Sequence, residues 1–299
     1  MRTLLLCLAF LVGGCASVPS ADTPRIAVIS AFAPELALLE SKVVGARKQT
    51  INGVEFTTGT LQGKPVVLFL SGMSMVNASM NTQLALEQFK VTHVVFSGIA
   101  GGVNPDLRVG DVVVAQHWAE YLEVVMGREV APGKFVPPGF MPTAKLPNWG
   151  MMFPAPVGVR SAKSATEESK LWFDVDPQLF DIARRAAVAA QLDQCDDSKH
   201  CLSHQPRVVI GGNGVSGQAF VDNAAFREYT FKTFGANVLD METAAVAHVA
   251  YSNGVPFIAF RSLSDLAGGG EGENEIGTFF KIAADNSAKV LLAFLAAWP

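Results

Sequence analysis

The sequence predicts an α/β fold built on a largely parallel or mixed sheet. Short apolar segments alternate along the chain with longer segments of helical periodicity. The apolar segments are nearly continuous rather than alternating, which is typical of strands covered on both faces. The chain has 299 residues, of which 49% are hydrophobic and 17% are charged, so it is long enough for a sizeable core. In such a sheet, ligands bind at the carboxyl ends of the strands.

The first half of the chain contains five expected strands and two expected helices. The apolar segment RIAVIS (25–30) predicts a buried strand, and PELALLESKV (34–43) predicts the helix that follows. Residues 54–72 predict a hairpin with its turn near Gly63. Next along the chain we expect a helix over 77–89, a strand over 93–98, a loop over 99–110 and a strand over 111–116.

The second half continues the alternation after a segment without a clear period. Residues 119–165 are rich in Pro, Gly and Met, so we expect an insertion that covers one side of the fold, as lids do. Beyond it we expect helices over 177–191, 242–253 and 278–298 and strands over 207–212, 238–241 and 256–264. No linker interrupts the chain after residue 25, which predicts one domain over 25–299.

The N-terminal segment MRTLLLCLAFLVGGCASVPS has the features of an export signal. One arginine precedes an apolar run that is too short to span a bilayer comfortably, and small residues follow. LVGGC resembles a bacterial lipobox, in which the signal is cut before the cysteine and the cysteine is lipidated. We therefore expect a signal peptide over 1–14, a lipidated tether over 15–24 that begins at Cys15, and a lipoprotein anchored at the periplasmic face of a membrane. A plain secretory signal with an incidental cysteine is the alternative.

Cysteine usage agrees with export. Cys7 would leave with the signal and Cys15 would carry lipid, so that Cys195 and Cys201 remain as one pair in QCDDSKHC. Two cysteines in a polar loop of an exported protein predict a local disulfide. A metal site that adds His200 and His204 is the weaker alternative, because the spacing is not that of a zinc finger. We expect no metal and no organic cofactor.

Two classes of function are disfavoured. The formal net charge is −4 and no run of like charge occurs, so the footprint of a nucleic-acid-binding protein is missing. The string GNGVSG (212–217) follows an expected strand, and Asp240 lies at a suitable distance for a dinucleotide site. However, the string comes late in the chain and leaves little sequence for the rest of a doubly wound domain.

Three segments carry a resemblance that covers most of the chain after the signal. They are IAVISAFAPELALL (26–39), SGIAGGVNPDLRVGDVVVA (97–115) and the motifs VSGQAFVDN, VLDMETAAVAHV and VPFIAFRSLSD within 215–265. They resemble the nucleoside phosphorylase/nucleosidase superfamily, most closely the 5′-methylthioadenosine/S-adenosylhomocysteine nucleosidases. AFVDNAAFRE and SLSDLAGGG also resemble plant bark and vegetative storage proteins. The resemblance implies a three-layer α/β/α fold, a nucleoside as small-molecule partner, release of adenine by hydrolysis, and a possible homo-oligomer.

The resemblance also implies roles for individual residues. Cleavage of the bond between C1′ and N9 needs an acid for the purine, a grip on the ribose and a nucleophile at C1′. Asp265 matches the acid that protonates N7, although a helix cap is its alternative role. Glu35 matches the glutamate that orients the water, and Arg261 an arginine near that water. Glu242 matches the residue that binds the ribose hydroxyls, with Asp240 in support.

The remaining matches concern the base, the sugar face and the 5′-substituent. Met241 matches the residue beneath the sugar, Phe220 the aromatic that stacks on the purine, Val221 the backbone that contacts the base edge, and Phe32 and Ile276 the lining of the 5′ pocket. Within GIAGG (98–102), Ile99 and Gly101 match the binding loop.

Ile99 departs from the pattern, because the nucleosidases have GSAGG with a serine there. The departure leaves open a non-catalytic binding or storage protein of the same fold. A phosphate-dependent phosphorylase is the other alternative, but the loop SAFAPE (30–35) offers no group that would hold phosphate.

Overall fold

A computed structural model describes residues 23–197 and 199–299. The signal peptide, Cys15 and most of the expected tether lie outside the described residues. The central sheet has twelve strands. Nine follow one path in the order β14 (Phe173–Asp174), β7 (His117–Glu120), β16 (Asn213–Ser216), β17 (Ala236–Asp240), β5 (Val91–Gly102), β1 (Arg25–Ser30), β4 (Lys64–Leu70), β3 (Val54–Leu61) and β2 (Val44–Ile51). The others branch from it: β18 (Phe257–Asp265) pairs with β5 and β6 (Val112–Val114), and β6 pairs with β15 (Val208–Ile210).

The pairing directions make the sheet mixed, which confirms the predicted fold class. β5 pairs in parallel with both β1 and β18, and antiparallel with β17 at its carboxyl end. All residues of β1 and of β18 are buried, as expected for strands with continuous apolar sequences. The long strand β5 therefore brings the carboxyl ends of β1, β17 and β18 to one region.

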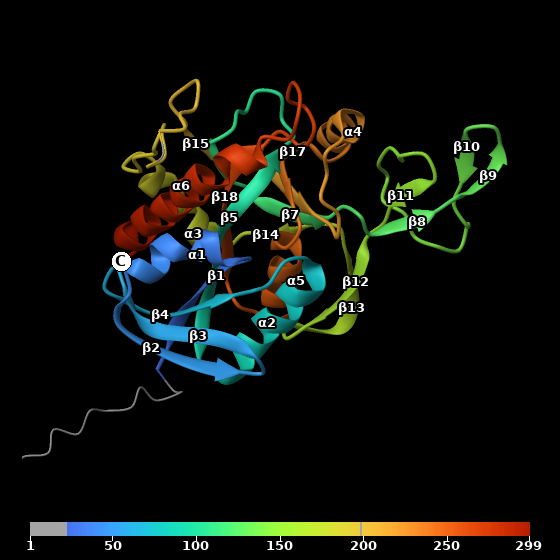
Figure 1. Cartoon of the computed structure of the whole chain (residues 1–299). Coiled ribbons are helices and arrows are strands. Elements are labelled where there is room, and N and C mark those ends of the chain that lie inside the picture. The colour runs from blue at the N-terminus through green and yellow to red at the C-terminus, as the bar shows by residue number, and fades with distance from the viewer. Residues whose placement is uncertain (1–22, 198) are drawn as a thin grey trace, which may run out of the picture.

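Helices cover both faces of the sheet (Figure 1). α6 (Ile276–Ala297) packs on β18 and β5 and contacts α1 (Ala33–Ser41) and α3 (Pro177–Ala187). α2 (Met75–Gln88) packs against α5 (Thr243–Asn253), which contacts β16 and β7, and α4 (Ala224–Phe234) lies beside β17. No helix among the described residues is long and apolar enough to cross a membrane.

Several element boundaries differ from those expected. Residues 99–102 belong to β5 and not to a loop. The helix expected over 34–43 ends at Ser41, and the unpredicted strand β2 follows. β2 lies at the edge of the sheet, and nearly all of its residues are exposed. An exposed edge strand carries no apolar pattern, so no apolar segment in the sequence predicted it.

The dinucleotide alternative for GNGVSG is excluded by the fold. Residues Asn213–Ser216 form strand β16 inside the sheet, so they are not the turn between a strand and a helix that a dinucleotide site needs. Gly214 is explained by packing. A Cβ atom at Gly214 would lie 2.5 Å from the ring of Trp118, which is fully buried.

Residues 119–165, expected as an insertion that covers one side of the fold, contact the body over part of their length. Trp149 packs on Phe226 and Tyr229 of α4, and the N–H of Ala162 donates to the carbonyl of Ser252 in α5. Residues 119 and 120 belong to β7 of the central sheet. The segment then forms the strands β8 (Val124–Met126), β9 (Arg128–Ala131), β10 (Lys134–Val136), β11 (Met152–Pro154) and β12 (Val157–Ser161), and β12 pairs with β13 (Ser164–Lys170). The pairs β9–β10 and β8–β11 extend away from the body (Figure 1). These short strands pair only with each other, which explains the weak sequence period.

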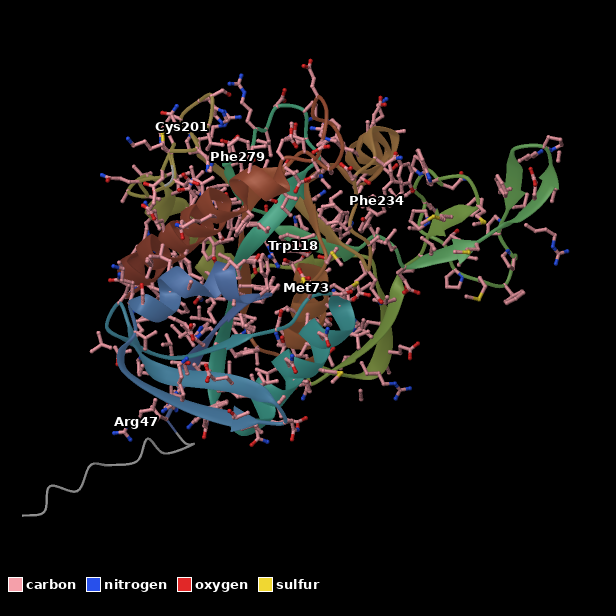
Figure 2. All side chains as sticks on the ribbon, in the orientation of Figure 1. Arg47, Met73, Trp118, Cys201, Phe234 and Phe279 are labelled. Carbon is pink, nitrogen blue, oxygen red and sulfur yellow. A yellow bond between two sulfur atoms is a disulfide. The ribbon has the colours of Figure 1, made fainter. Side chains whose placement is uncertain are left out.

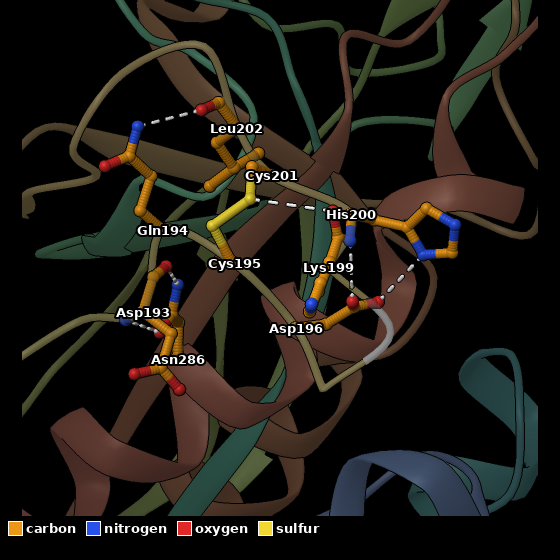
Figure 3. The surroundings of a disulfide bond; sticks show 9 residues. All are labelled: Asp193, Gln194, Cys195, Asp196, Lys199, His200, Cys201, Leu202 and Asn286. Carbon is orange, nitrogen blue, oxygen red and sulfur yellow. Dashed lines mark hydrogen bonds and ion pairs between the residues drawn. A yellow bond between two sulfur atoms is a disulfide. The ribbon is translucent and has the colours of Figure 1, made fainter.

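Cys195 and Cys201 form the disulfide that the cysteine count predicts (Figure 3). The loop around it is tied to α6, because the backbone N–H of Asp193 donates to Asn286 Oδ1 at 2.7 Å. His200 contacts Asp196 and His204 lies nearest Asp111, so neither histidine joins the cysteines. Within the described ranges, no group of three or more His, Cys, Asp or Glu residues is placed to hold a metal ion.

Candidate active site

A cavity opens where the carboxyl ends of β1, β5, β17 and β18 meet, as the rule for α/β sheets predicts. Among the residues singled out from the sequence, those that line this cavity are Phe32, Glu35, Ile99, Gly101, Phe220, Val221, Asp240, Met241, Glu242, Asp265 and Ile276. They come from segments far apart in the chain. No residue of the 119–165 segment lines it, so that segment does not shape the cavity within this chain.

Asp240 is fully engaged by protein groups. Its Oδ1 accepts hydrogen bonds from the backbone N–H of Glu242 at 3.2 Å and of Thr243 at 3.1 Å. Its Oδ2 lies 2.8 Å from Arg261 Nε, and the hydroxyls of Ser216 and Thr243 also bond to the carboxylate. The carboxylate thus satisfies the first N–H groups of α5 and binds the arginine. Asp240 therefore supports the site from beneath.

Arg261, expected near the nucleophilic water and among the substrate-binding residues, does not line the cavity. It is fully buried, with its guanidinium 4.1 Å from the centre of the Phe96 ring. Besides Asp240, Nη1 lies 3.8 Å from Glu35 Oε1, and Nη2 lies 3.8 Å from Glu242 Oε2. The guanidinium thus lies behind three carboxylates, two of which project past it into the cavity. The family motif predicted that Arg261 belongs to the site, but it did not predict that the side chain is buried behind the cavity wall.

Gly98 makes room for this arrangement. A Cβ atom at Gly98 would lie 2.1 Å from Arg261 Nη1 and 2.6 Å from Glu35 Oε1. Real atoms do not approach so closely, and both groups are fixed by other bonds. A side chain at position 98 would therefore separate the arginine from Glu35.

Glu35 is held by backbone N–H groups from two elements. Its Oε2 accepts from Ala31 at 2.7 Å and from Phe32 at 3.4 Å, and its Oε1 accepts from Ile99 at 2.7 Å. Burial raises the pKa of Glu35, while the charge of Arg261 and the three backbone donors oppose the rise. The carboxylate is thus fixed at the cavity wall, with a greater affinity for protons than an exposed glutamate has.

Glu242 is buried at the start of α5, and its Oε2 lies 3.8 Å from Nη2 of Arg261. Its Oε1 accepts a hydrogen bond from the backbone N–H of Ser74 at 2.7 Å. Burial raises the pKa of Glu242 to about 7, and the charges of Asp240 and Glu35 add to the rise against the opposing effects of Arg261 and the Ser74 N–H. Its Oε2 lies beyond hydrogen-bond distance of Arg261. This oxygen is available to a group bound in the cavity.

Asp265 ends β18 on another wall of the cavity, and no basic side chain of the described residues contributes to the shift of its pKa. Its Oδ1 accepts from the backbone N–H of Ala267 at 2.8 Å, and its Oδ2 accepts from the Ser264 hydroxyl at 2.9 Å. Burial raises the pKa of Asp265, and these hydrogen bonds with that of Asn274 oppose the rise. Asp265 can therefore hold a proton at a higher pH than an exposed aspartate can.

Some contributions to the cavity were not anticipated from the sequence, among them two side chains and one backbone donor. Met73 lines it and is 61% exposed, Ser264 lines it beside Asp265, and the N–H of Ser74 binds Glu242. The segment SGMSM (71–75) reads only as a turn before a helix. A backbone donor leaves no trace in the residue type, so the sequence could not reveal the role of Ser74.

Comparison with known families agrees with this geometry. A family model described as the phosphorylase superfamily matches residues 25–296, which is nearly all of the described chain. The chain belongs to this superfamily. It is 31% identical to the 5′-methylthioadenosine/S-adenosylhomocysteine nucleosidase of Lysinibacillus sphaericus over 91% of this chain and 99% of that one. It is 30% identical to the nucleosidase of the same name from Halalkalibacterium halodurans, over 91% and 97% of the two chains.

Solved structures of this superfamily show the same architecture. The nucleosidase of Neisseria meningitidis in complex with methylthio-immucillin-A superposes with a TM-score of 0.67 at 26% identity, over 92% of this chain and 99% of that one. The Streptococcus pneumoniae nucleosidase with the transition-state inhibitor MT-ImmA gives a TM-score of 0.65 at 25% identity, over 91% and 99%. The predicted superfamily is therefore confirmed.

The raised pKa of Glu242 predicts a pH-dependent stability. Native Glu242 binds its proton more tightly than the unfolded chain does, so its contribution to stability falls as pH rises from about 4.5 towards 7. Glu242→Gln removes this contribution. We expect the variant to gain about 3 kcal/mol of unfolding free energy relative to the wild type between pH 4 and pH 8. Urea unfolding of both proteins at each pH measures the difference, and parallel pH curves would contradict the assignment.

Proposed function

We propose that the protein is a purine nucleosidase, which hydrolyses the N-glycosidic bond of an adenosine-like nucleoside and releases adenine. The proposed substrates are 5′-methylthioadenosine and S-adenosylhomocysteine, the molecules named for the relatives from Lysinibacillus sphaericus and Halalkalibacterium halodurans. The observation that carries the proposal is the placing of Glu35, Glu242 and Asp265, three buried carboxyl groups, around one cavity of a chain that belongs to this superfamily.

The chemistry divides among these three groups. Asp265 donates its proton to N7 of the purine as the bond between C1′ and N9 breaks and the electron pair moves onto the base. The free Oε2 of Glu242 accepts hydrogen bonds from ribose hydroxyls, which steadies the sugar as positive charge develops on it. Glu35 orients a water towards C1′ and takes a proton from it as the new C–O bond forms. The products are adenine and the free 5′-substituted ribose.

Water is favoured over phosphate as the nucleophile. The cavity lining contains carboxylates but no Lys, Arg or His among the described residues. Arg261 lies behind the wall and is paired with Asp240. A phosphate dianion would therefore meet negative charge without an exposed cation to bind it.

Apolar side chains support the proposed orientation of the substrate. Phe220 is 57% exposed beside the cavity and offers a face for stacking on the purine, and the neighbouring Val221 offers its backbone to the base edge. Phe32, Met73 and Ile276 give an apolar lining that suits a methylthio group at the 5′ position. Met241 packs beneath the sugar in this arrangement.

The proposal predicts that the purified protein releases adenine from 5′-methylthioadenosine at the same rate with and without phosphate. Chromatography of the products measures both adenine and the sugar. Turnover that depends on phosphate and yields a ribose 1-phosphate would establish a phosphorylase. Binding of a nucleoside without turnover would establish the storage or binding alternative, with Ile99 as the first residue to change to Ser.

Asp265→Asn tests the proton donor. The amide keeps the shape of the side chain but cannot supply the proton, and general acid catalysis contributes about 10²–10⁴-fold. We expect kcat to fall by that factor while KM changes little, because the proton is needed only as the bond breaks. Steady-state kinetics at neutral pH measure the effect, with circular dichroism to check the fold. If the variant keeps the full kcat of the wild type, Asp265 is not the proton donor and serves only as a structural cap.

We also propose that the protein is exported and held at the periplasmic face of a membrane by lipid on Cys15. The lipobox-like LVGGC and the pairing of Cys195 with Cys201, a bond that persists in oxidising compartments, support this proposal. We also propose a homo-oligomer, which the resemblance implies, and light scattering measures the oligomeric state.

Lipidation predicts that the protein partitions into the detergent phase and that Cys15→Ser moves it into the aqueous phase. Phase separation in Triton X-114 measures the partition, because a lipid chain favours the detergent phase. Mass spectrometry of the mature protein provides the control. An unmodified Cys15 would contradict the anchor.

A further inference from the structure

The peptide unit between Met73 and Ser74 is anchored at both of its polar atoms. The carbonyl oxygen of Met73 accepts a hydrogen bond from Asn77 Nδ2 at 2.8 Å, and the N–H of Ser74 donates to Glu242 Oε1 at 2.7 Å. Asn77 lies in the first turn of α2, whereas Glu242 begins α5 on a distant part of the chain. Met73 is labelled near the centre of the view in Figure 2, and the residue is 61% exposed. One peptide thus connects a surface amide to a carboxylate of the cavity.

The backbone at Ser74 adopts a conformation that serine does not favour. Its φ is 73° and its ψ is 160°, a region occupied almost only by glycine because a Cβ atom is crowded there. The Ser74 side chain makes no capping hydrogen bond that would favour this geometry. Such a conformation persists only where surrounding contacts hold it. The two anchors of the peptide are such contacts. Two further hydrogen bonds hold the neighbouring backbone: the N–H of Ala78 donates to the Ser74 carbonyl at 3.0 Å, and Asn81 Nδ2 donates to the Ser71 carbonyl at 2.8 Å.

We propose that the Met73–Ser74 peptide is a positioning element for Glu242 and that Asn77 is the residue that holds the peptide in place. The Ser74 N–H occupies one carboxylate oxygen and so directs the other, Oε2, towards the cavity. The same peptide carries the Met73 side chain, which lines the cavity. Asn77 itself is exposed, so it acts on the site only through the peptide.

The groups around Glu242 determine how its pKa would change if the Ser74 N–H no longer bound it. The charged groups that face Glu242 are Asp240 at the end of β17, Glu35 of α1 and Arg261 of β18, and the Ser74 N–H is the donor from the α2 side. The N–H stabilises the ionised form of Glu242 and lowers its pKa. If the peptide turns away, the ionised form loses its one direct hydrogen bond among the described residues. Glu242 would then ionise only at a higher pH.

The role of Asn77 rests in part on the proposed function, and kinetics give the first test. In Asn77→Ala we expect KM for 5′-methylthioadenosine to rise at least tenfold, with a smaller change in kcat, because a misdirected Glu242 grips the ribose less well. The acid limb of the kcat/KM profile should move to higher pH. Asn77→Asp, which places a carboxylate against the Met73 carbonyl, should move it further. Gln88→Ala is the matched control, because it removes an exposed amide from the other end of the same helix. It should leave the pH profile unchanged.

A second readout does not need activity. The pH at which the protein loses the stability contributed by protonated Glu242 should be higher in Asn77→Ala than in the wild type, as measured by thermal unfolding between pH 5 and pH 9. In a Glu242→Gln background, Asn77→Ala should cause no such shift. A shift that persists without Glu242, or no shift in either background, would overturn the proposal. Absence of adenine release by the wild type would defeat the proposed function alone, since the unfolding measurement still tests Asn77.

Discussion

The buried guanidinium of Arg261 is the interaction on which the rest of the site depends. It lies fully buried among Glu35, Asp240 and Glu242, and its nearest carboxylate oxygen is 2.8 Å away. Three carboxylates gathered in a dry region repel one another, and burial raises the pKa of Glu35 and of Glu242. A fixed cation beneath them lowers that cost. The face of Phe96 and the small volume of Gly98 leave the arginine room to sit there.

The acids differ because each has different partners. Asp240 is satisfied by N–H groups of α5, two hydroxyls and the arginine, so it builds the floor of the cavity. Glu35 is held by three backbone donors, and Glu242 keeps one oxygen open. Asp265 lies apart from the arginine, and only short-range hydrogen bonds oppose the effect of its burial. Environments that separate the proton affinities of neighbouring acids are what acid–base chemistry requires.

Ile99 shows how a departure from a motif can leave part of its role intact. Its backbone N–H donates to Glu35 and its carbonyl accepts from Arg261 Nη1 at 3.2 Å, so both bonds are independent of the side chain. The side chain lines the cavity, where the nucleosidase motif would present a hydroxyl. The water must therefore rely on fewer polar groups. This is the local reason why turnover, and not binding alone, is the decisive measurement for this chain.

By itself, the sequence determined the superfamily, the alternation of strands and helices, and most of the residues that reach the cavity. Those features follow from apolar periodicity and from motifs whose residue types carry the chemistry, such as Asp265 at the end of a buried strand. It could not determine the exposed edge strand β2, the outward course of the pairs β8–β11 and β9–β10, or the depth of Arg261, because these depend on which elements pack together. The tertiary structure alone decided that the Ser74 N–H meets Glu242. That contact joins backbone to side chain across 168 positions of sequence, and a backbone donor is the same in every residue except proline.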